Sequence, residues 1–587
     1  MAKHRYLSIF NTQNLRKDMQ KRWVEIPVEQ PELLTKLQQE LQLDELLCRL
    51  LLNRGIASFD AAREFFRPAL EHLHDPFLMQ DMERAVLRIE QAITSGEKIL
   101  IYGDYDVDGT TAVALVYQFF VAIHQKIDFY IPDRYAEGYG ISFKGIDFAE
   151  ANGFSLIIAL DCGIKSVDKV EYAKSRGIDF IICDHHLPGE TLPEAVAVLD
   201  PKRSDCSYPY KELAGCGIGF KLIQAYSQKN ELPFENLLPY LDLVAVSIAA
   251  DIVPLNGENR TLAWYGLRRL NEHPRPGLAA LMDISGRKGE YSLSDAVFQL
   301  GPRINAAGRI ADAKNAVQLL ISITKDDAQA KAKLVDLNNE ERRGHDSDIT
   351  EQALSQIKSN SALINRKSTV VYQEDWHKGV IGIVASRLTE TYYRPTVVLT
   401  QSNGMVAGSA RSVMGFDLYE ALSACGDLLE QFGGHKYAAG LTMKTEHVPA
   451  FRERFEEVVA ASITEELLTQ EIKLEATLRL DQITGKFFRI LNQFEPHGPQ
   501  NMTPVFLSKN VYTYGTASVV GGKHLKLKIR QGDSAYFDCI GFGLGEWCEE
   551  LNQGQPFDVC YSIEENNWKD RKNIQLKIRD IRILGDR

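Results

Sequence analysis

Residues 98–121, KILIYGDYDVDGTTAVALVYQFFV, give the clearest indication of the fold of the first half of this chain. A short apolar run leads into a turn with three aspartates, and a longer apolar segment without Gly or Pro follows. The first pattern predicts a buried strand, and the second predicts a helix. A strand, a charged turn and a helix in this order are typical of the start of a parallel α/β sheet.

The strand pattern returns four times before residue 202. Each time an apolar run ends in polar residues, as in IDFYIPDR (127–134), FSLIIALDCG (154–163), IDFIICDHH (178–186) and AVAVLDP (195–201). Helix-like segments such as VDKVEYAKSRG lie between them. The alternation predicts a parallel sheet with helices on both faces. Functional groups in such sheets gather beyond the carboxyl ends of the strands.

The rest of the chain predicts three further parts. Residues 324–366 are charged and lack Pro, which suits a long exposed helix between domains. A second α/β alternation starts at Ser368, and short strands from about Glu471 predict a small barrel. We therefore expect two α/β lobes joined by a long helix, followed by an all-β barrel. The expected boundaries are 1–70 for an N-terminal helical segment, 71–323, 324–366, 367–465 and 470–587.

Composition excludes several classes of protein. The chain has 587 residues, of which 44% are hydrophobic and 25% charged, and its net charge of −12 argues against a protein that coats DNA in bulk. Nine cysteines without a CxxC pair argue against a disulfide framework or a zinc ribbon. No stretch approaches the ~18 apolar residues of a membrane span, the start resembles no signal peptide, and no GxxxxGK[ST] loop for ATP is present. We expect a cytoplasmic protein that uses neither a membrane nor ATP.

The aspartates of GDYDVDG carry the strongest chemical signal. If Asp104, Asp106 and Asp108 alternate along a strand end, their carboxylates project to one side and repel one another unless a cation lies among them. An EF-hand loop would require a glutamate at its twelfth position, where this chain has Leu115. A solvated acidic turn is the remaining alternative for this run taken alone.

Further acids and imidazoles follow the other predicted elements. Asp161 follows one strand, Asp184, His185 and His186 follow the next, and Asp251 ends an apolar helix-like segment. Carboxylates with imidazoles and no thiolate suit Mn²⁺ or Mg²⁺, so we expect Cys162 and Cys183 to be core residues. Two such ions can activate water and stabilise an in-line displacement at phosphorus. The pattern predicts metal-assisted hydrolysis of a phosphoester or phosphoanhydride.

The motifs DYDVDG, LDCG, CDHH and AADIVPL resemble, in order and spacing, those of the DHH phosphoesterases. GPRINAAGR, DWHKGVIGIVASRL, GSARS and FGGHKYAAG are similar to motifs of the bacterial members of that superfamily that degrade single-stranded DNA. The resemblance covers residues 70–445. It implies a DHH domain, a DHHA1-like domain and, in the tail, an OB fold.

The resemblance also implies ligands for two divalent ions. Asp108, Asp161, His185 and Asp251 would form one site, and Asp106 with the shared Asp161 would form the other. Some relatives have a His where this chain has Tyr102, so Asp104 is a possible additional ligand. His186 would approach the scissile phosphate or the leaving oxygen.

A second set of residues is expected to hold the nucleic acid. Arg303, Asn305 and Arg309 are expected in a Gly- and Ala-rich loop, with Arg134 as a further contact, because Arg suits bidentate phosphate binding. A second phosphate pocket would comprise Ser409, Arg411, Gly433, Gly434 and His435. In the tail, Lys526, Lys528 and Arg530 would share one strand face, near Tyr512, Tyr514, Tyr536 and Phe537.

The resemblance implies a two-metal exonuclease that degrades single-stranded DNA from its 5′ end in repair and recombination. Its expected partners are single-stranded DNA, a single-strand-binding protein and a helicase. One alternative is a phosphodiesterase for short oligonucleotides or cyclic dinucleotides, which the barrel-like tail disfavours. The other is a DNA-binding scaffold without activity, which the complete set of motif acids disfavours.

Overall fold

A computed structural model describes residues 21–568 and 571–584 of the chain. The chain divides into two compact units: one holds residues 63–345 with 495–502, and the other holds the remaining described residues. The boundary falls inside the long helix α16 (Lys325–Lys358), which the charged segment 324–366 predicted. The first 20 residues of the expected N-terminal segment lie outside the described residues.

The first unit contains the predicted parallel sheet. Its strand order is β3-β2-β4-β5-β6, and every neighbouring pair is parallel. The five strands are β2 (Lys98–Gly103), β3 (Ile127–Tyr130), β4 (Phe154–Leu160), β5 (Asp179–Cys183) and β6 (Ala197–Leu199). Because all are parallel, their carboxyl ends lie at one edge, where the acids of the sequence motifs follow.

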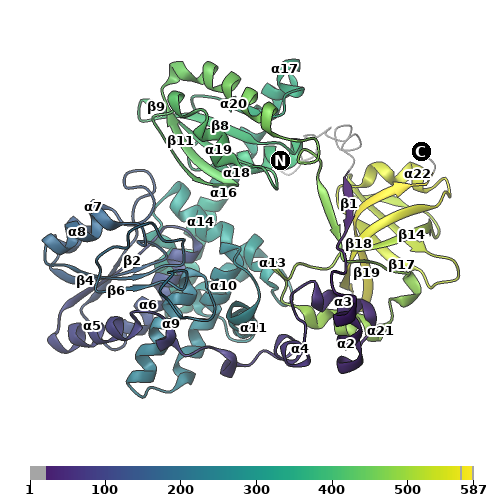
Figure 1. Ribbon diagram of the computed structural model, residues 1–587. Helices are drawn as coiled ribbons and strands as arrows, with labels where there is room; N and C mark the ends of the chain where they lie inside the picture. The colour runs from purple at the N-terminus through teal and green to yellow at the C-terminus, as the bar shows by residue number, and fades with distance from the viewer. Residues whose placement is uncertain (1–20, 569–570, 585–587) are drawn as a thin grey trace. The chain divides into compact units, whose positions relative to one another are not determined.

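Helices cover both faces of this sheet (Figure 1). Along β2, Ile99 and Ile101 belong to one apolar core, and Leu100 and Tyr102 belong to the other, as the two-residue period of a strand requires. The helices on the first face are α5 (Met82–Ser95), α6 (Val107–Val121) and α9 (Gly215–Lys229). Those on the second face are α7 (Phe143–Ala151) and α8 (Val167–Ser175). Cys162 and Cys183 are buried in these cores, as expected.

The unit continues as helices, and one of them corrects a prediction. GPRINAAGR forms α14 (Gly301–Ile310) and is not a loop, because a π-turn, η4 (Ala296–Leu300), leads directly into it. Its backbone amides are therefore engaged within the helix and cannot serve as phosphate donors. The other helices here are α10 (Leu241–Asp251), α11 (Gly257–Glu272), α12 (Pro276–Ser285), α13 (Leu293–Asp295) and α15 (Lys314–Leu320).

The second unit contains a five-stranded mixed sheet of order β10-β11-β9-β8-β7. Only β7 and β8 are parallel, and α18 (Ile381–Tyr392) connects them. The strands are β7 (Thr369–Tyr372), β8 (Thr396–Ser402), β9 (Met405–Arg411), β10 (Gln431–His435) and β11 (Ala438–Met443). With α19 (Leu418–Ser423) and α20 (Val448–Ser462), this is the second α/β lobe that the sequence predicts.

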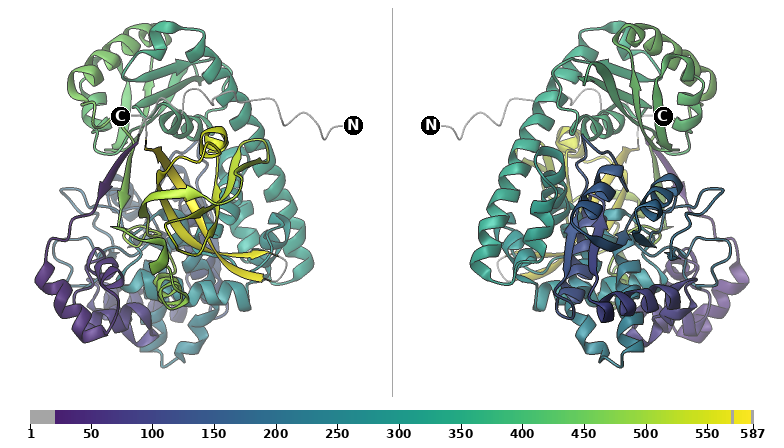
Figure 2. Two further views of the ribbon diagram at one scale, coloured as in Figure 1. Left: turned by 90° about the vertical axis from the view of Figure 1, so that its right-hand side faces the viewer. Right: turned by 90° about the vertical axis from the view of Figure 1, so that its left-hand side faces the viewer.

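The C-terminal strands form the predicted barrel (yellow in Figure 2). Strands β14-β18-β19-β17-β16 are paired in that order, and a further pairing of β14 with β16 closes the ring. Their bounds are β14 (Phe506–Thr513), β16 (His524–Arg530), β17 (Phe537–Gly541), β18 (Phe557–Trp568) and β19 (Arg571–Ile583). β15 (Ser518–Val520) and β13 (Ala476–Thr477) add to the barrel, which carries the short helices α21 (Gly485–Leu491) and α22 (Cys548–Leu551).

The N-terminal segment packs beside the barrel through a separate two-stranded sheet. β1 (Arg22–Glu25) pairs in parallel with β12 (Glu471–Leu474), and the buried Arg54 forms an ion pair of 2.9 Å with Glu475. The helices that follow β1 are α2 (Pro31–Leu41), α3 (Glu45–Leu52) and α4 (Phe59–Phe66).

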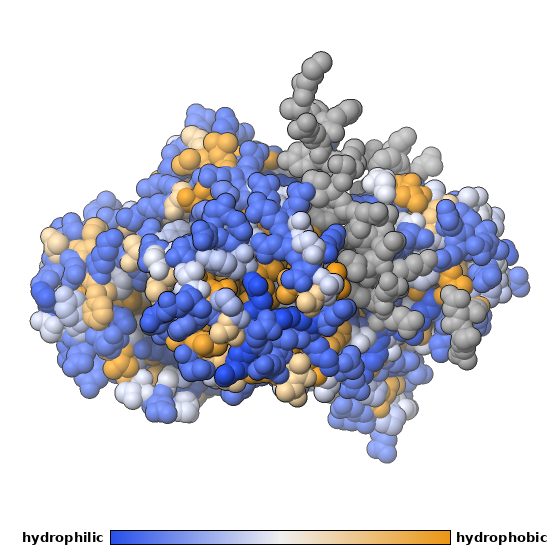
Figure 3. Space-filling model, turned by 90° about the horizontal axis from the view of Figure 1, so that it is seen from above, coloured by the Kyte–Doolittle hydropathy of each residue, from blue (hydrophilic) through white to orange (hydrophobic). Residues whose placement is uncertain are grey.

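Within the described residues, no helix is long and apolar enough to cross a membrane. Hydrophilic residues predominate on the surface seen in Figure 3, and apolar residues form small scattered groups.

Candidate active site

The aspartate turn begins where β2 ends. Asp104 is buried, and its Oδ1 accepts a hydrogen bond of 3.1 Å from the amide of Gly140. The three aspartates do not alternate along a strand, because Asp106 caps α6 by accepting the amide of Gly109, and Asp108 lies in the first turn of that helix. A Cβ at Gly109 would lie 2.5 Å from the carbonyl oxygen of Asp104, so this tight strand-to-helix turn requires glycine.

Asp108 is held by the amino-terminal end of α9. Its Oδ2 accepts the amide of Gly215 at 2.7 Å, and its Oδ1 accepts the amide of Cys216 and the hydroxyl of Ser247, both at 2.7 Å. A helix N-terminus presents free N–H groups and a partial positive charge, which together favour a carboxylate. Asp108 is therefore fixed in position before any ligand binds.

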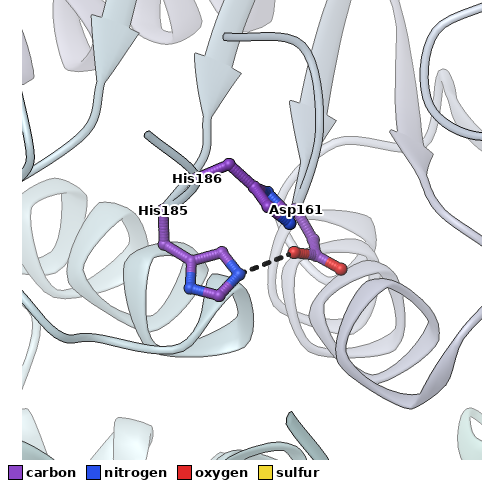
Figure 4. Close-up of side chains that lie close together, drawn as sticks. All are labelled: Asp161, His185 and His186. Atoms are coloured by element: carbon purple, nitrogen blue, oxygen red, sulfur yellow. Dashed lines mark ion pairs between the residues drawn. The ribbon is translucent and has the colours of Figure 1, made fainter. Parts of the chain in front are cut away.

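His185 lies among three carboxylates from three different elements. Its Nε2 is 3.2 Å from Oδ1 of Asp161, 3.6 Å from Oδ2 of Asp251 and 3.8 Å from Oδ2 of Asp108. Figure 4 shows Asp161 and His185 pointing toward each other from their loops. Asp161 has a φ of +59°, a left-handed conformation that brings its carboxylate to the edge of the sheet. Four of the predicted ligands thus meet at one place.

The electrostatics of this cluster disfavour its charged form in the absence of a cation. Burial, with the neighbouring carboxylates, raises the pKa values of Asp161 and Asp106, and it raises the pKa of Asp251 to about 9. Burial also lowers the pKa of His185 and raises that of Asp104 to about 8. Crowded carboxylates with raised pKa values are typical of functional sites.

Asp184 and His186 form a second arrangement beside the cluster. The buried Asp184 accepts amides from Ile164, His185 and His186, and its Oδ1 also lies 2.7 Å from Nδ1 of His186. These bonds outweigh burial and hold the pKa of Asp184 at about 2. Burial alone would lower the pKa of His186, but its bond to Asp184 raises it. Nε2 of His186 lies 3.4 Å from the hydroxyl of Tyr139.

The donor set fits a hard divalent cation. Two groups have ligand atoms within 4.8 Å of one another: Asp108, His185 and Asp251, and separately Asp161, His185 and His186. Among the described residues, Oδ1 of Asp161 and both ring nitrogens of His185 are buried without a hydrogen-bond partner. Such atoms are costly unless a ligand satisfies them, and oxygen and imidazole donors suit Mn²⁺ or Mg²⁺. His186, expected to face the phosphate, lies within reach of the same cluster.

The arginines of the first unit have different surroundings. Arg303 is buried against Asp336 (Nε to Oδ1, 2.8 Å) and also donates to the carbonyl of Gln299. Arg134 donates to the carbonyl of Gly308 at 3.1 Å and stacks 3.9 Å from the ring centre of Tyr105. Oδ1 of Asn305 is buried without a hydrogen-bond partner among the described residues. Arg134 therefore lies beside the end of α14, where Arg309 also lies.

The residues predicted to form a second phosphate pocket lie on β9 and β10, on either side of β11. In the sheet register, Arg411 and His435 flank Ala438, and Ser409 and Gly433 flank Gly440. The guanidinium of Arg411 donates to the hydroxyl of Ser409 at 3.1 Å, and burial lowers its pKa. Gly434 has a φ of +148°, and a Cβ there would lie 2.3 Å from a carbonyl oxygen. The five predicted residues of this pocket thus lie together.

The barrel also presents the predicted basic face. On β16, Leu525, Leu527 and Ile529 are buried, so Lys526, Lys528 and Arg530 face outward. Tyr514 and Tyr536 stack with ring centres 5.0 Å apart, and Nζ of Lys528 lies 4.4 Å from the ring centre of Tyr536. Phe537 pairs with the inward-facing Ile529, so its side chain lies on the opposite face of the sheet from the three basic residues.

Two residues that shape the site were not among its predicted members. One is Asp184, whose position between a strand end and two histidines is the signal that it accepts their hydrogen bonds. The other is Gly215, in the segment GCGIGF, whose amide donates to Oδ2 of Asp108 at 2.7 Å. A Cβ at Gly215 would lie 2.7 Å from that of Asp161, so the approach of α9 to the site also requires glycine.

Three family descriptions match the chain. The DHH family, N-terminal domain, matches residues 98–248, the DHHA1 domain matches residues 365–461, and the RecJ OB domain matches residues 474–580. Together they cover both α/β lobes and the barrel.

Individual relatives match along most of the chain. The single-stranded-DNA-specific exonuclease RecJ of Bacillus subtilis is 39% identical over 95% of this chain and 70% of its own length. That of Escherichia coli is 32% identical over 92% and 96%. The crystal structure of RecJ from Thermus thermophilus with Mn²⁺ has a TM-score of 0.82 and 27% identity, and the match covers 96% of this chain and 79% of that one. The chain belongs to the RecJ family of the DHH phosphoesterases.

Proposed function

We propose that this protein is a two-metal exonuclease that hydrolyses single-stranded DNA from its 5′ end in DNA repair and recombination. The observation that carries the proposal is the group of buried, unsatisfied donor atoms on Asp161 and His185 at the carboxyl edge of the sheet. Membership of the RecJ family, whose named members are specific for single-stranded DNA, supports the choice of substrate.

The metal ligands of the proposal are Asp106, Asp108, Asp161, His185 and Asp251, with Asp104 as a possible addition. Two Mn²⁺ or Mg²⁺ ions bound there would activate a water and neutralise charge at the scissile phosphate. The Thermus thermophilus RecJ has been crystallised with each of these ions, which supports this choice. Neither ring nitrogen of His185 has a hydrogen-bond partner among the residues that the structure describes, so either nitrogen can ligate a metal ion.

His186 would move the proton in this reaction. Asp184 accepts a hydrogen bond from Nδ1 of His186 and raises the pKa of the ring. A raised pKa favours the imidazolium form, in which Nε2 also carries a proton. A protonated imidazole beside the cluster can give that proton to the leaving oxygen or neutralise the phosphate. The carboxylate of Asp108 keeps its geometry because two backbone amides hold it.

Recognition of the 5′ end would rest on the pocket of the second unit. Arg411 is a largely buried cation, and no carboxylate pairs with it among the described residues, which favours an incoming anion. Ser409, Gly433, Gly434 and His435 would complete the phosphate contacts. Arg134, Arg303, Asn305 and Arg309 would contact the strand nearer the metals; for Arg303 this requires exchange of Asp336.

The outward face of β16 would bind the strand beyond the active site. Lys526, Lys528 and Arg530 supply charge, and the stacked Tyr514 and Tyr536 supply flat apolar surfaces for bases. We further propose the five-part domain division given above, a cytoplasmic location, and a helicase and a single-strand-binding protein as partners. The family resemblance supports these partners.

The test uses internally labelled single strands blocked at either the 5′ or the 3′ end. With Mn²⁺, the protein is expected to release mononucleotides from the 3′-blocked strand and to spare the 5′-blocked one. Asp161→Asn is expected to reduce the rate by about a thousandfold or more, while Asp168→Asn, an exposed position on α8, is the matched control. Equal digestion of both strands would refute the polarity, and an active Asp161→Asn variant would refute the metal site.

A further inference from the structure

An exposed apolar pair lies beside the proposed phosphate pocket of the second unit. Met414 and Tyr437 expose 72% and 40% of their surface, and the hydroxyl of Tyr437 lies 3.8 Å from the sulfur of Met414. Tyr437 belongs to the turn between β10 and β11, and Met414 to the loop after β9. Large apolar side chains in contact with each other and with solvent are often part of a binding surface.

Backbone hydrogen bonds place this pair at the pocket. The amide of Ser412, next to Arg411, donates to the carbonyl of Tyr437 at 3.1 Å. The amide of Tyr437 donates to Nδ1 of His435 at 3.3 Å. The pair therefore lies at the same end of the three strands as Arg411 and His435, which flank Ala438 in the register.

The bond to His435 also fixes the chemistry of that ring. When Nδ1 accepts an amide hydrogen, the proton of the neutral imidazole must be on Nε2. His435 can thus donate from Nε2, and its ring is exposed. The pocket then combines two donors, a guanidinium and an imidazole N–H, and an apolar platform adjoins it. A phosphate attached to a flat, apolar ring system has the matching chemistry.

We propose that Tyr437 and Met414 form a platform for the 5′-terminal nucleobase of the strand whose phosphate binds at Arg411. Tyrosine offers a rigid aromatic face, and methionine offers a polarisable thioether that adapts to rings of different shape. Such a platform reads no base edge, so it accepts every base and rejects an end that lacks one. It would position the terminal nucleotide in addition to its phosphate. This inference rests on the proposed 5′-end recognition.

The test compares two 5′-phosphorylated single strands that differ only at the first residue, which is either a normal nucleotide or an abasic tetrahydrofuran. For release of that residue, the wild-type protein is expected to have a KM about tenfold lower on the normal strand. Tyr437→Ala and Met414→Ala should each raise the KM for the normal strand toward that for the abasic strand and leave the abasic KM unchanged. Tyr437→Phe keeps the aromatic face and should behave as wild type.

Controls separate the platform from the pocket. Tyr419→Ala removes an equally exposed tyrosine, whose ring packs on Phe432, and should keep the tenfold preference. Arg411→Ala should abolish the preference for a 5′-phosphate over a 5′-hydroxyl, and if it does not, the proposed 5′ pocket fails. If Arg411→Ala behaves as expected but the wild-type protein handles normal and abasic ends equally, the platform is overturned. Equal rises of both KM values in Tyr437→Ala would also overturn it.

Discussion

Neutralising Asp184 should destabilise the first unit, whereas neutralising the neighbouring Asp200 should not. Both aspartates are buried at the ends of adjacent strands, β5 and β6. Asp184 accepts three amides and the ring of His186, and its pKa is held at about 2. Oδ2 of Asp200 has no hydrogen-bond partner among the described residues, and burial raises the pKa of this carboxyl to about 7. The fold therefore stabilises the ionised form of Asp184 and destabilises that of Asp200.

The magnitude follows from these pKa values. A folded-state pKa of about 2 lies below the ordinary value of 3.8, so ionised Asp184 contributes about 2–3 kcal/mol at neutral pH. That contribution is present above the unfolded pKa and is lost as pH falls through about 2. Asp184→Asn also turns an amide hydrogen toward the N–H of Ile164, which leaves that donor unsatisfied. The contribution of Asp200 to stability has the opposite sign, because its raised pKa lowers the free energy of unfolding as pH rises from about 4 to about 7.

The assay is thermal unfolding in EDTA at about pH 8, with both variants and the wild-type protein in parallel. Asp184→Asn is expected to lower the Tm of the first unit by roughly 4–12 °C. Asp200→Asn is expected to leave the Tm unchanged or to raise it slightly. Equal losses in the two variants would refute the reasoning, because both would then reflect the removal of any buried charge at this edge.

Three further predictions follow from the site and the barrel. Without metal, the pKa of Asp161 is raised by burial and that of Asp251 is raised to about 9, so stability falls as pH rises from about 4 toward about 9. Mn²⁺ should therefore raise the Tm more at about pH 8.5 than at about pH 6, and equal shifts would contradict this. Gly109→Ala should lose activity and about 2–4 kcal/mol of stability, because the added Cβ would meet the backbone of Asp104. The control is Gly344→Ala on α16, where a Cβ would have nothing within 4 Å, and a denaturant titration should show this variant to be neutral or stabilised. Tyr536→Ala should weaken the binding of single-stranded DNA by about 1–3 kcal/mol at fixed salt. Lys528→Ala should reduce the slope of log K against log salt concentration by about 0.7. If fluorescence-anisotropy titrations of both variants match the wild type, β16 does not contact the strand.

Much of the site could be predicted from local pattern. A buried strand and the residue after it are adjacent in sequence, so apolar runs that end in Asp161 or in Asp184, His185 and His186 locate those side chains at one sheet edge. The two-residue period of β16 likewise assigned Lys526, Lys528 and Arg530 to a common face. These predictions depended on neighbours along the chain.

Other features depended on contacts between distant segments. Local pattern suggested a loop at Arg303, Asn305 and Arg309, but the turn η4 continues into α14 and Arg303 meets Asp336. Gly and Ala together favour neither state strongly, so packing decides between helix and loop. The capping of α6 by Asp106 was missed for a related reason, because an acidic residue after a strand can end the strand or begin the helix.

Periodicity and short motifs are enough to predict the class of fold, the order of its parts and the acids and histidines of the site. Three features follow from tertiary contacts: the amides of α9 hold Asp108, Asp184 raises the pKa of His186, and β14 pairs with β16 to close the barrel. The same contacts bring Tyr437, with Met414, beside the backbone next to Arg411. These contacts join residues far apart in the chain, and their strength depends on burial. A local sequence pattern therefore does not reveal them.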